Sequence, residues 1–258
     1  LMSHVFSPEL VALGEVLIDF TQTGFSSNGQ VLFERNAGGA PANVAVQAAR
    51  LGMSAQFVGK VGADMHGDFL RRSLQERGVD VSSVVQDPEA FTTLAFVEVD
   101  SRTAERSFSF ARKPGADTRL SPAEVPEQVI RDCHVLHVGS LSLTDEPARA
   151  ATLHAVSIAR QAGTLISCDP NYRVSLWPSE SEAIEQMTML LQQADLVKIN
   201  EDEALLLCGT SNPEVAAQYI LDRGATLVAV TLGSQGALVA TQTECVLVPT
   251  RPCQARDT

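Results

Sequence analysis

The chain has 258 residues, of which 45% are hydrophobic and 19% charged, and its formal net charge is −12. The length suits one large α/β domain or two small ones, and the composition is that of a folded protein. The negative charge argues against a sequence-independent grip on nucleic acid or on anionic lipid, because both need a basic surface.

The chain carries no sign of a membrane or secretory segment. We find no apolar run of about 18 residues, so the sequence predicts no transmembrane helix. The opening "LMSHVFSPEL" lacks the basic region and long apolar stretch of a secretory signal, and we interpret it as a cloning remnant or a short leader.

The first part of the chain alternates strands and helices. Residues 10–20, "LVALGEVLIDF", form an apolar run that predicts one central strand with Asp19 at its far end. Val44, Ala48 and Leu51 follow helical spacing, and Gly52 ends that helix. A strand over 55–62 and a helix over 66–78 follow.

Two segments break this alternation. Residues 91–112 alternate polar and apolar positions around the turn "SRTA", and residues 20–36 show a similar pattern broken by Gly24 and "SNG". Both predict antiparallel hairpins, which do not fit a strand–helix repeat. We expect them to form a separate small sheet.

The alternation then returns. A helix over 120–132 is predicted with Ser121 as its cap, Pro122 at the first position and Glu124 completing a capping box. The remaining strands are expected over 134–143, 164–171, 195–200, 226–233, 236–243 and 244–250, and the remaining helices over 146–163, 179–194, 201–209 and 213–224. This order predicts a three-layer α/β/α fold with a mostly parallel sheet. No linker divides the chain, so we expect one domain over 1–258.

The five cysteines are scattered along the chain: Cys133, Cys168, Cys208, Cys245 and Cys253. An odd, dispersed set suits reduced thiols in a cytoplasmic protein better than a disulfide framework. Metal ligation by Cys133 with its neighbours His134 and His137 is conceivable. We favour a structural interpretation, because the two histidines would point to opposite sides of a strand.

Polar or glycine-rich clusters follow several predicted strands: Asp19, Gly38–Gly39, 167–173, 198–203 and 231–236. Ligands bind beyond the carboxyl ends of strands in open α/β sheets, so this rim is the predicted site. Each cluster also has a structural interpretation, as a turn, a positive-φ glycine or a helix cap, and Asn43 could likewise satisfy free helix amides. The GxGxxG and P-loop motifs are both absent.

The combination is more specific than its parts. "GGAPANVAVQAARLG", "FVGKVGADMHGDFL", "DPNYR", "KINEDE" and "VTLGSQG", in this order, resemble the ribokinase-like (PfkB) carbohydrate kinase family. "LIDF", "RKPGAD" and "CDPNYRVSLWP" are most similar to its fructokinase branch. The resemblance implies a small β-sheet lid, formed here by the hairpins, and transfer of the γ-phosphoryl group of ATP to a hexose hydroxyl.

The resemblance also implies roles for individual residues. Asp19, Gly38, Gly39 and Asn43 would hold the sugar, with Phe96 and Phe110 covering it and Arg112 and Arg173 supplying positive charge. For Arg112 the alternative is a solvated charge at a strand end. Lys198, Asn200, Thr231, Gly233 and Gly236 would bind the nucleotide, and Glu203 would organise Mg²⁺ through water.

The chain departs from the family pattern at its end. Family members continue into a Gly-Ala-Gly-Asp motif that holds the general base, whereas this sequence stops at Asp257 and Thr258, the first residues of the match. We therefore name no catalytic base, interpret the C-terminal part as missing, and expect the chain as given to be nearly inactive.

Three alternatives stay open from the sequence. A 2-keto-3-deoxygluconate kinase, or another sugar kinase of the family, would share this architecture. A non-catalytic sugar-sensing protein would keep only the sugar site. A nicotinamide-dependent dehydrogenase is disfavoured, since the first strand–helix turn lacks the fingerprint. Pairing of lid edges in a homodimer is also conceivable.

Overall fold

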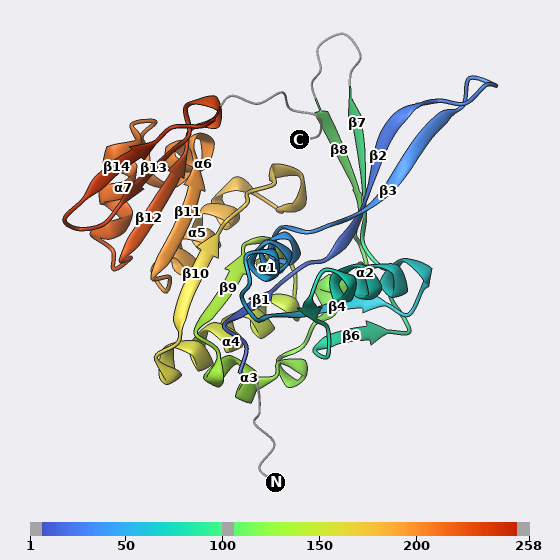
Figure 1. Cartoon of the computed structure of the whole chain (residues 1–258), viewed down its shortest axis with the longest axis horizontal. Helices are drawn as coiled ribbons and strands as arrows, with labels where there is room; N and C mark the ends of the chain where they lie inside the picture. The colour runs from blue at the N-terminus through green and yellow to red at the C-terminus, as the bar shows by residue number, and fades with distance from the viewer. Residues whose placement is uncertain (1–6, 100–105, 252–258) are drawn as a thin grey trace. The chain divides into compact units, whose positions relative to one another are not determined.

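The computed structural model describes residues 7–99 and 106–251, so Cys253, Asp257 and Thr258 lie outside the described residues. The chain divides into two compact units, residues 1–164 and 165–258, which are described separately (Figure 1). The prediction of one domain over 1–258 stays a prediction. Among the described residues, no helix has both the length and the apolar character needed to cross a membrane.

Unit 1 is built on parallel strands. β9 (Val135–Gly139), β1 (Leu10–Leu13), β4 (Ala55–Gly62) and β5 (Val79–Asp80) lie side by side in this order, and β6 (Val84–Asp87) also pairs with β4. Leu10 of β1 is in register with Ala55 and Val135 of its neighbours. The α/β class with a mostly parallel sheet is confirmed.

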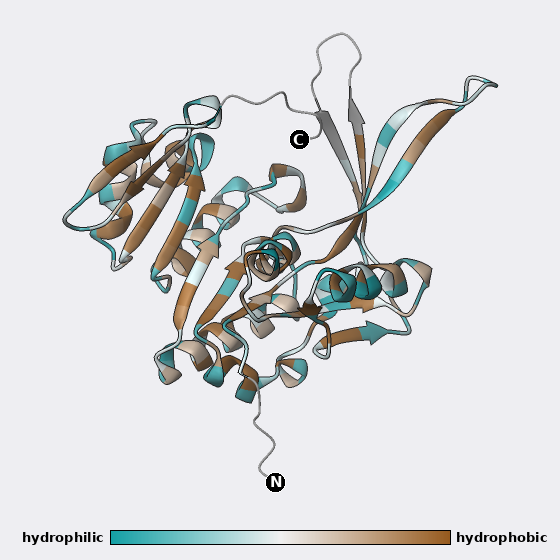
Figure 2. Cartoon of the chain, viewed as in Figure 1, coloured by the Kyte–Doolittle hydropathy of each residue, from teal (hydrophilic) through white to brown (hydrophobic). Residues whose placement is uncertain are grey.

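Both faces of β1 are buried, and α1 (Ala40–Arg50) covers one of them. Ala12 of β1 belongs to a core cluster with Ala42, Ala45 and Ala48 of α1. Val11 and Leu13 point to the opposite face and are also completely buried. Strands buried on both faces carry continuous apolar sequence, which is why the run at the start of this chain does not alternate (Figure 2). The other helices of unit 1 are α2 (Met65–Glu76), α3 (Glu127–Asp132) and α4 (Ala148–Ala162).

Unit 1 also contains a second, four-stranded sheet. Its order is β3 (Val31–Gly38), β2 (Leu17–Phe25), β7 (Leu94–Val99) and β8 (Arg106–Ala111). The β2–β3 and β7–β8 pairs are antiparallel, and β2 runs parallel to β7. The expected small sheet made of two hairpins is therefore confirmed.

The single strand expected over residues 10–20 is wrong. The run breaks between β1 and β2 at Gly14, whose φ is +152°. A Cβ at Gly14 would also lie 2.7 Å from Cγ of Pro41. Asp19 consequently lies within β2 of the small sheet and not at the end of a central strand.

Two other boundaries differ from expectation. The helix predicted over 120–132 splits at Pro126 into a short 3₁₀ turn, Pro122–Glu124, and α3, because proline lacks the N–H that would continue the helix. The capping box is present: Glu124 accepts the N–H of Ser121 at 2.8 Å. The strand predicted over 134–143 ends at Gly139, and a 3₁₀ turn follows over Leu141–Leu143.

Unit 2 is also built of strands and helices, with parallel strands in its sheet. Its strands follow the order β14 (Cys245–Val248), β13 (Ala237–Ala240), β12 (Leu227–Thr231), β11 (Leu196–Asn200) and β10 (Leu165–Asp169). β10, β11 and β12 are parallel, whereas β13 and β14 are antiparallel additions. The helices are α5 (Glu180–Leu191), α6 (Glu201–Cys208) and α7 (Pro213–Leu221).

Candidate active site

A carboxylate lies directly over a glycine in unit 1. Asp19 of β2 is in register with Asn36 of β3, two residues before Gly38. A Cβ added to Gly38 would collide with the Asp19 carboxylate. The absence of a side chain at Gly38 therefore makes room for the Asp19 carboxylate against bare backbone, and both belong to the predicted sugar site.

The next residue is also restricted to glycine. Gly39 caps α1 with a φ of 107°, a conformation that side chains disfavour. A Cβ there would lie 2.5 Å from the carbonyl oxygen of Glu15 and 2.9 Å from Cα of Val16. One turn into α1, Asn43 donates its N–H to the Gly39 carbonyl at 2.9 Å and is exposed. Its side chain is available for a ligand.

Glu15 supports this turn, and sequence reasoning missed it. Oε1 of Glu15 accepts the N–H of Ala40 at 3.0 Å, although the residue is only 2% exposed. Burial raises the pKa of the Glu15 carboxyl to about 7. The available signal was a single acidic residue inside the otherwise apolar run "LVALGEVLI".

The two phenylalanines expected to cover the sugar lie on opposite faces of the small sheet. Asp19 is in register with Ala95, and Ala95 with Phe110, so Phe110 shares the face of Asp19. Phe96 is in register with Phe20 and stacks on it, with ring centroids 5.4 Å apart.

The Phe20 face packs toward α2. The ring centroids of Phe20 and His66 of α2 lie 5.8 Å apart, edge to face. The guanidinium of Arg35 lies 4.0 Å from the centroid of the Phe69 ring. Successive strand residues point to opposite faces, so the two rings do not lie on one face of this sheet, and their expected role in covering the sugar stays a prediction.

Arg112 is buried, so the alternative of a solvated charge at a strand end is wrong. It is 3% exposed, and its Nε donates to Oδ2 of Asp117 at 2.8 Å. Nη1 donates to Oγ1 of Thr144 and Nη2 to the carbonyl of Leu141, both at 2.8 Å. The guanidinium thus joins the end of β8 to two other segments of unit 1.

In unit 2, an ion pair lies near the carboxyl ends of two neighbouring strands. Nζ of Lys198 in β11 lies 3.1 Å from Oδ2 of Asp169, the last residue of β10. Asp169 also accepts the N–H of Asn171 at 3.2 Å. Arg173, in the same loop, donates to the carbonyl of Tyr172 at 3.2 Å. Its expected role toward a sugar stays a prediction.

Asn200 and Glu203 form a complete capping box at the start of α6. Oδ1 of Asn200 accepts the N–H of Glu203 at 2.8 Å, and Oε2 of Glu203 accepts the N–H of Asn200 at 2.9 Å. Oε1 of Glu203 accepts the N–H of Tyr172 at 2.8 Å. Each carboxylate oxygen is therefore bonded to backbone, and the carboxylate ties the loop after β10 to the end of β11.

Glu203 is 2% exposed, and burial raises the pKa of its carboxyl. Asp169 adds to this rise in pKa, while Lys198 opposes it, so the three charges lie within one electrostatic environment. In the part of the chain that the structure describes, no group of three or more His, Cys, Asp or Glu side chains could hold a metal ion.

The remaining nucleotide-side residues cluster around β12. Thr231 is in register with Asn200, so their side chains share a sheet face. After Thr231 the chain turns through Gly233, with a φ of 53°, and Gly236, with a φ of 108°. A Cβ at Gly236 would strike the carbonyl of Val248, whereas one at Gly233 would meet open space. Of these two glycines, Gly233 is the one with open space beside its backbone.

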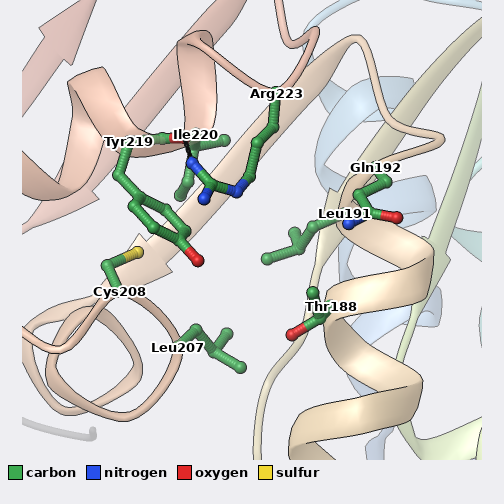
Figure 3. A pocket seen from close by; sticks show the side chains of 8 residues that line it. All are labelled: Thr188, Leu191, Gln192, Leu207, Cys208, Tyr219, Ile220 and Arg223. Carbon is green, nitrogen blue, oxygen red and sulfur yellow. Dashed lines mark hydrogen bonds between the residues drawn. The ribbon is translucent and has the colours of Figure 1, made fainter.

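A separate hollow lies among the helices of unit 2 (Figure 3). It is lined by Thr188, Leu191, Gln192, Leu207, Cys208, Tyr219, Ile220 and Arg223, none of which is a predicted site residue. The Arg223 guanidinium stacks 3.3 Å from the centroid of the Tyr219 ring. Burial raises the pKa of Cys208 to about 11, so its thiol stays protonated and unreactive at neutral pH.

Comparison with known proteins decides the family. The model of the pfkB family carbohydrate kinases matches residues 7–258. The chain belongs to this family. It is 43% identical to Fructokinase-1 of Oryza sativa subsp. japonica over 252 residues, which cover 96% of this chain and 78% of the relative.

Solved structures agree. The fructokinase of Xylella fastidiosa with bound ATP superimposes with a TM-score of 0.88 at 35% identity, covering 98% of this chain and 77% of that one. The fructokinase of Vibrio cholerae O395 in its fructose, ADP and calcium ion bound form gives 0.86 at 32% identity, covering 98% and 79%. The chain is a fructokinase-like PfkB sugar kinase, as the sequence motifs predicted.

Proposed function

We propose that this protein transfers the γ-phosphoryl group of ATP to a hydroxyl of fructose. The observation that carries the proposal is the Asp19 carboxylate over Gly38, beside the Gly39 turn that opens α1. Two solved relatives support the choice of ligands, because one is titled as holding ATP and the other as holding fructose and ADP.

On the sugar side, binding depends on hydroxyl recognition. The Asp19 carboxylate accepts hydrogen bonds from two sugar hydroxyls, and the amide of Asn43 both donates and accepts. Gly38 and Gly39 let the ring approach the backbone closely. Phe110, on the same sheet face as Asp19, excludes water from the bound sugar, and Phe96 has no part in this contact.

On the nucleotide side, Lys198 supplies positive charge to the phosphates, and Asn200 and Thr231 line the same sheet face. Arg173 supplies positive charge near the sugar or the transferred phosphoryl group. Gly233 and the neighbouring Gly236 form the turn for the nucleotide. Arg112 has another task in this proposal: it holds Asp117 inside unit 1 and acts on the sugar only by fixing the small sheet.

The donor set suits Mg²⁺ that is held mainly by phosphates and water. A protein cage for the ion is absent among the described residues, but Asp169 and Glu203 lie close enough for one to raise the pKa of the other. Magnesium usually keeps several waters, and the Asp169 carboxylate would hold one of them. The ion supplies neutralisation of the phosphate charge. Glu203 would act only at a distance, since backbone N–H groups already occupy both oxygens.

The small sheet also offers a surface for a second copy of the chain. Phe25, Val31, Leu32 and Phe33 of the β2–β3 hairpin are exposed by 39–66%, and exposed edges favour pairing. A homodimer through these residues stays a proposal, as does a cytoplasmic location.

The test is an assay of ADP release with a panel of sugars. Turnover with fructose well above other hexoses supports the proposal. Turnover only with 2-keto-3-deoxygluconate would replace fructose by that acidic sugar. Fructose binding without ADP release would favour a sugar-sensing role instead.

A further inference from the structure

Within unit 1, all four strands of the small sheet have one end beside a buried polar cluster that includes Glu15, Arg112 and Asp117. Glu15 lies two residues before β2, and Ala40, which donates to Glu15, lies two residues after β3. Thr93 directly precedes β7, and Arg112 directly follows β8. The cluster therefore stands at the root of the sheet that carries Asp19 and Phe110.

Asp117 joins two of these roots. One carboxylate oxygen accepts the hydroxyl of Thr93, and the other accepts Nε of Arg112. Both Asp117 and Arg112 are less than a tenth exposed. The pair is compact and internally satisfied, as a buried ion pair must be.

Glu15 differs from its neighbours because half of its carboxyl is unsatisfied. Oε1 accepts the N–H of Ala40, but Oε2 is buried and has no hydrogen-bond partner within residues 7–99 and 106–251. A buried carboxylate oxygen without a donor is costly, whereas a neutral carboxyl costs much less. The charged groups that act on Glu15 are Arg112, which favours its ionised form, and Asp117, which opposes it.

Glu15 also touches the sugar turn through its main chain. Its carbonyl oxygen lies 2.5 Å from the position that a Cβ of Gly39 would take, and its side chain accepts the N–H of Ala40, the residue after Gly39. Any movement of Glu15 therefore moves Gly38 and Gly39, and with them the backbone beneath Asp19.

We propose that Glu15 is a positioning residue for the sugar site, and that its neutral carboxyl holds the Gly38–Gly39 turn in the form that binds sugar. This inference rests on the proposed function. When Glu15 loses its proton to solvent, the buried charge draws the turn toward water and weakens sugar binding. By linkage, sugar binding returns one proton from solvent to Glu15.

The size of the effect follows from the titration of Glu15. With a pKa of about 7, the fraction of neutral carboxyl falls about tenfold between pH 6 and pH 8. Fructose affinity is expected to fall by up to the same factor over this range. Glu15→Gln, which is permanently neutral and of the same shape, should bind fructose equally well at both pH values.

The experiment is calorimetric titration of fructose into the ADP-saturated protein at pH 6, 7 and 8, in two buffers that differ in ionisation enthalpy. Wild type should take up about one proton per sugar near pH 8, and E15Q none. Glu124→Gln is the matched control, since Glu124 is a carboxylate of unit 1 bound to Lys60 and lies outside the sugar site. It should keep the wild-type pH dependence.

A second measurement needs no sugar. The unfolded carboxyl has a pKa near 4.5 and the folded one about 7, so wild type should lose stability relative to E15Q as the pH rises from 4.5 to 7. Sugar affinity of E15Q that falls with pH as in wild type would overturn the inference alone. Absence of fructose binding by folded wild type at every pH would overturn the proposed function as well.

Discussion

The two units treat their polar site residues differently. In unit 1 the Asp19 carboxylate lies over a bare glycine and Asn43 is exposed, while a separate buried cluster holds the backbone beneath them. In unit 2 Glu203 bonds two backbone N–H groups and Asp169 bonds Lys198. In unit 1 buried residues outside the predicted sugar set, such as Glu15, hold the backbone near Gly39, whereas in unit 2 the predicted site residue Glu203 itself holds the backbone.

This difference has a consequence for mutagenesis. A substitution at a sugar-contacting residue of unit 1 should change affinity without unfolding the protein. A substitution at Glu203 should change both, because the carboxylate is part of the scaffold. The following predictions test that contrast, from the largest expected effect to the smallest.

Replacing the supporting arginine should have the largest effect on stability. Arg112→Leu leaves Asp117 buried without its ion partner, and breaking such a pair costs about 3–5 kcal/mol. Chemical denaturation measures the loss. The double variant R112L/D117N should recover part of it, because the unpaired charge is removed. Unchanged stability with lost fructose affinity would instead make Arg112 a direct sugar ligand.

Removing the sugar carboxylate should have the largest effect on affinity. Asp19→Ala is expected to raise KM for fructose about 100-fold, equivalent to about 3 kcal/mol, since charge-assisted hydrogen bonds are lost. KM for ATP should change less than about twofold. Steady-state kinetics gives both KM values. Asp19→Asn keeps an acceptor, so its KM for fructose should lie between those of wild type and Asp19→Ala. Parallel loss of both affinities would indicate misfolding.

Glu203→Ala should affect stability and metal requirement together. Two partly buried backbone N–H groups, of Tyr172 and Asn200, lose their acceptor, at a cost of up to about 1–3 kcal/mol each. The Mg²⁺ concentration for half-maximal activity should rise more than KM for fructose. Melting curves and a metal titration separate the two effects. A variant that melts earlier but titrates as wild type would reduce Glu203 to a scaffold residue.

The smallest expected effects distinguish the two phenylalanines. Phe110→Ala should raise KM for fructose several-fold, because it loses about 1 kcal/mol of apolar cover on the Asp19 face. Phe96→Ala should leave this KM unchanged and lower stability by about 1–2 kcal/mol through its lost stacking with Phe20. The reverse pattern would show that the sugar lies on the other face of the small sheet.

Much of the fold was predictable because it depends on local pattern. The apolar strand runs, the capping box at Ser121 and the hairpins around residues 91–112 all follow from short-range chemistry. The break at Gly14 was hidden, since it lies inside the largely apolar run "LVALGEVLI" and its close contact is with the distant Pro41.

The site was predictable from motifs only as a set of residues. Register determines the face of a strand residue, and spacing in sequence does not give register, so Phe96 and Phe110 could not be separated. The hydrogen bonds of Arg112 with Thr144 and Leu141 could not be predicted either, because these residues are 32 and 29 positions away along the chain. Glu15 was missed for the same reason: Ala40, its partner, is 25 positions away.

The most direct test of the central claim is a crystal structure of this protein soaked with fructose. The ketose should lie against Gly38 and Gly39, with its hydroxyls on the Asp19 carboxylate and the Asn43 amide. Fructose bound elsewhere, or an ordered ketose without contact to Asp19, would contradict it.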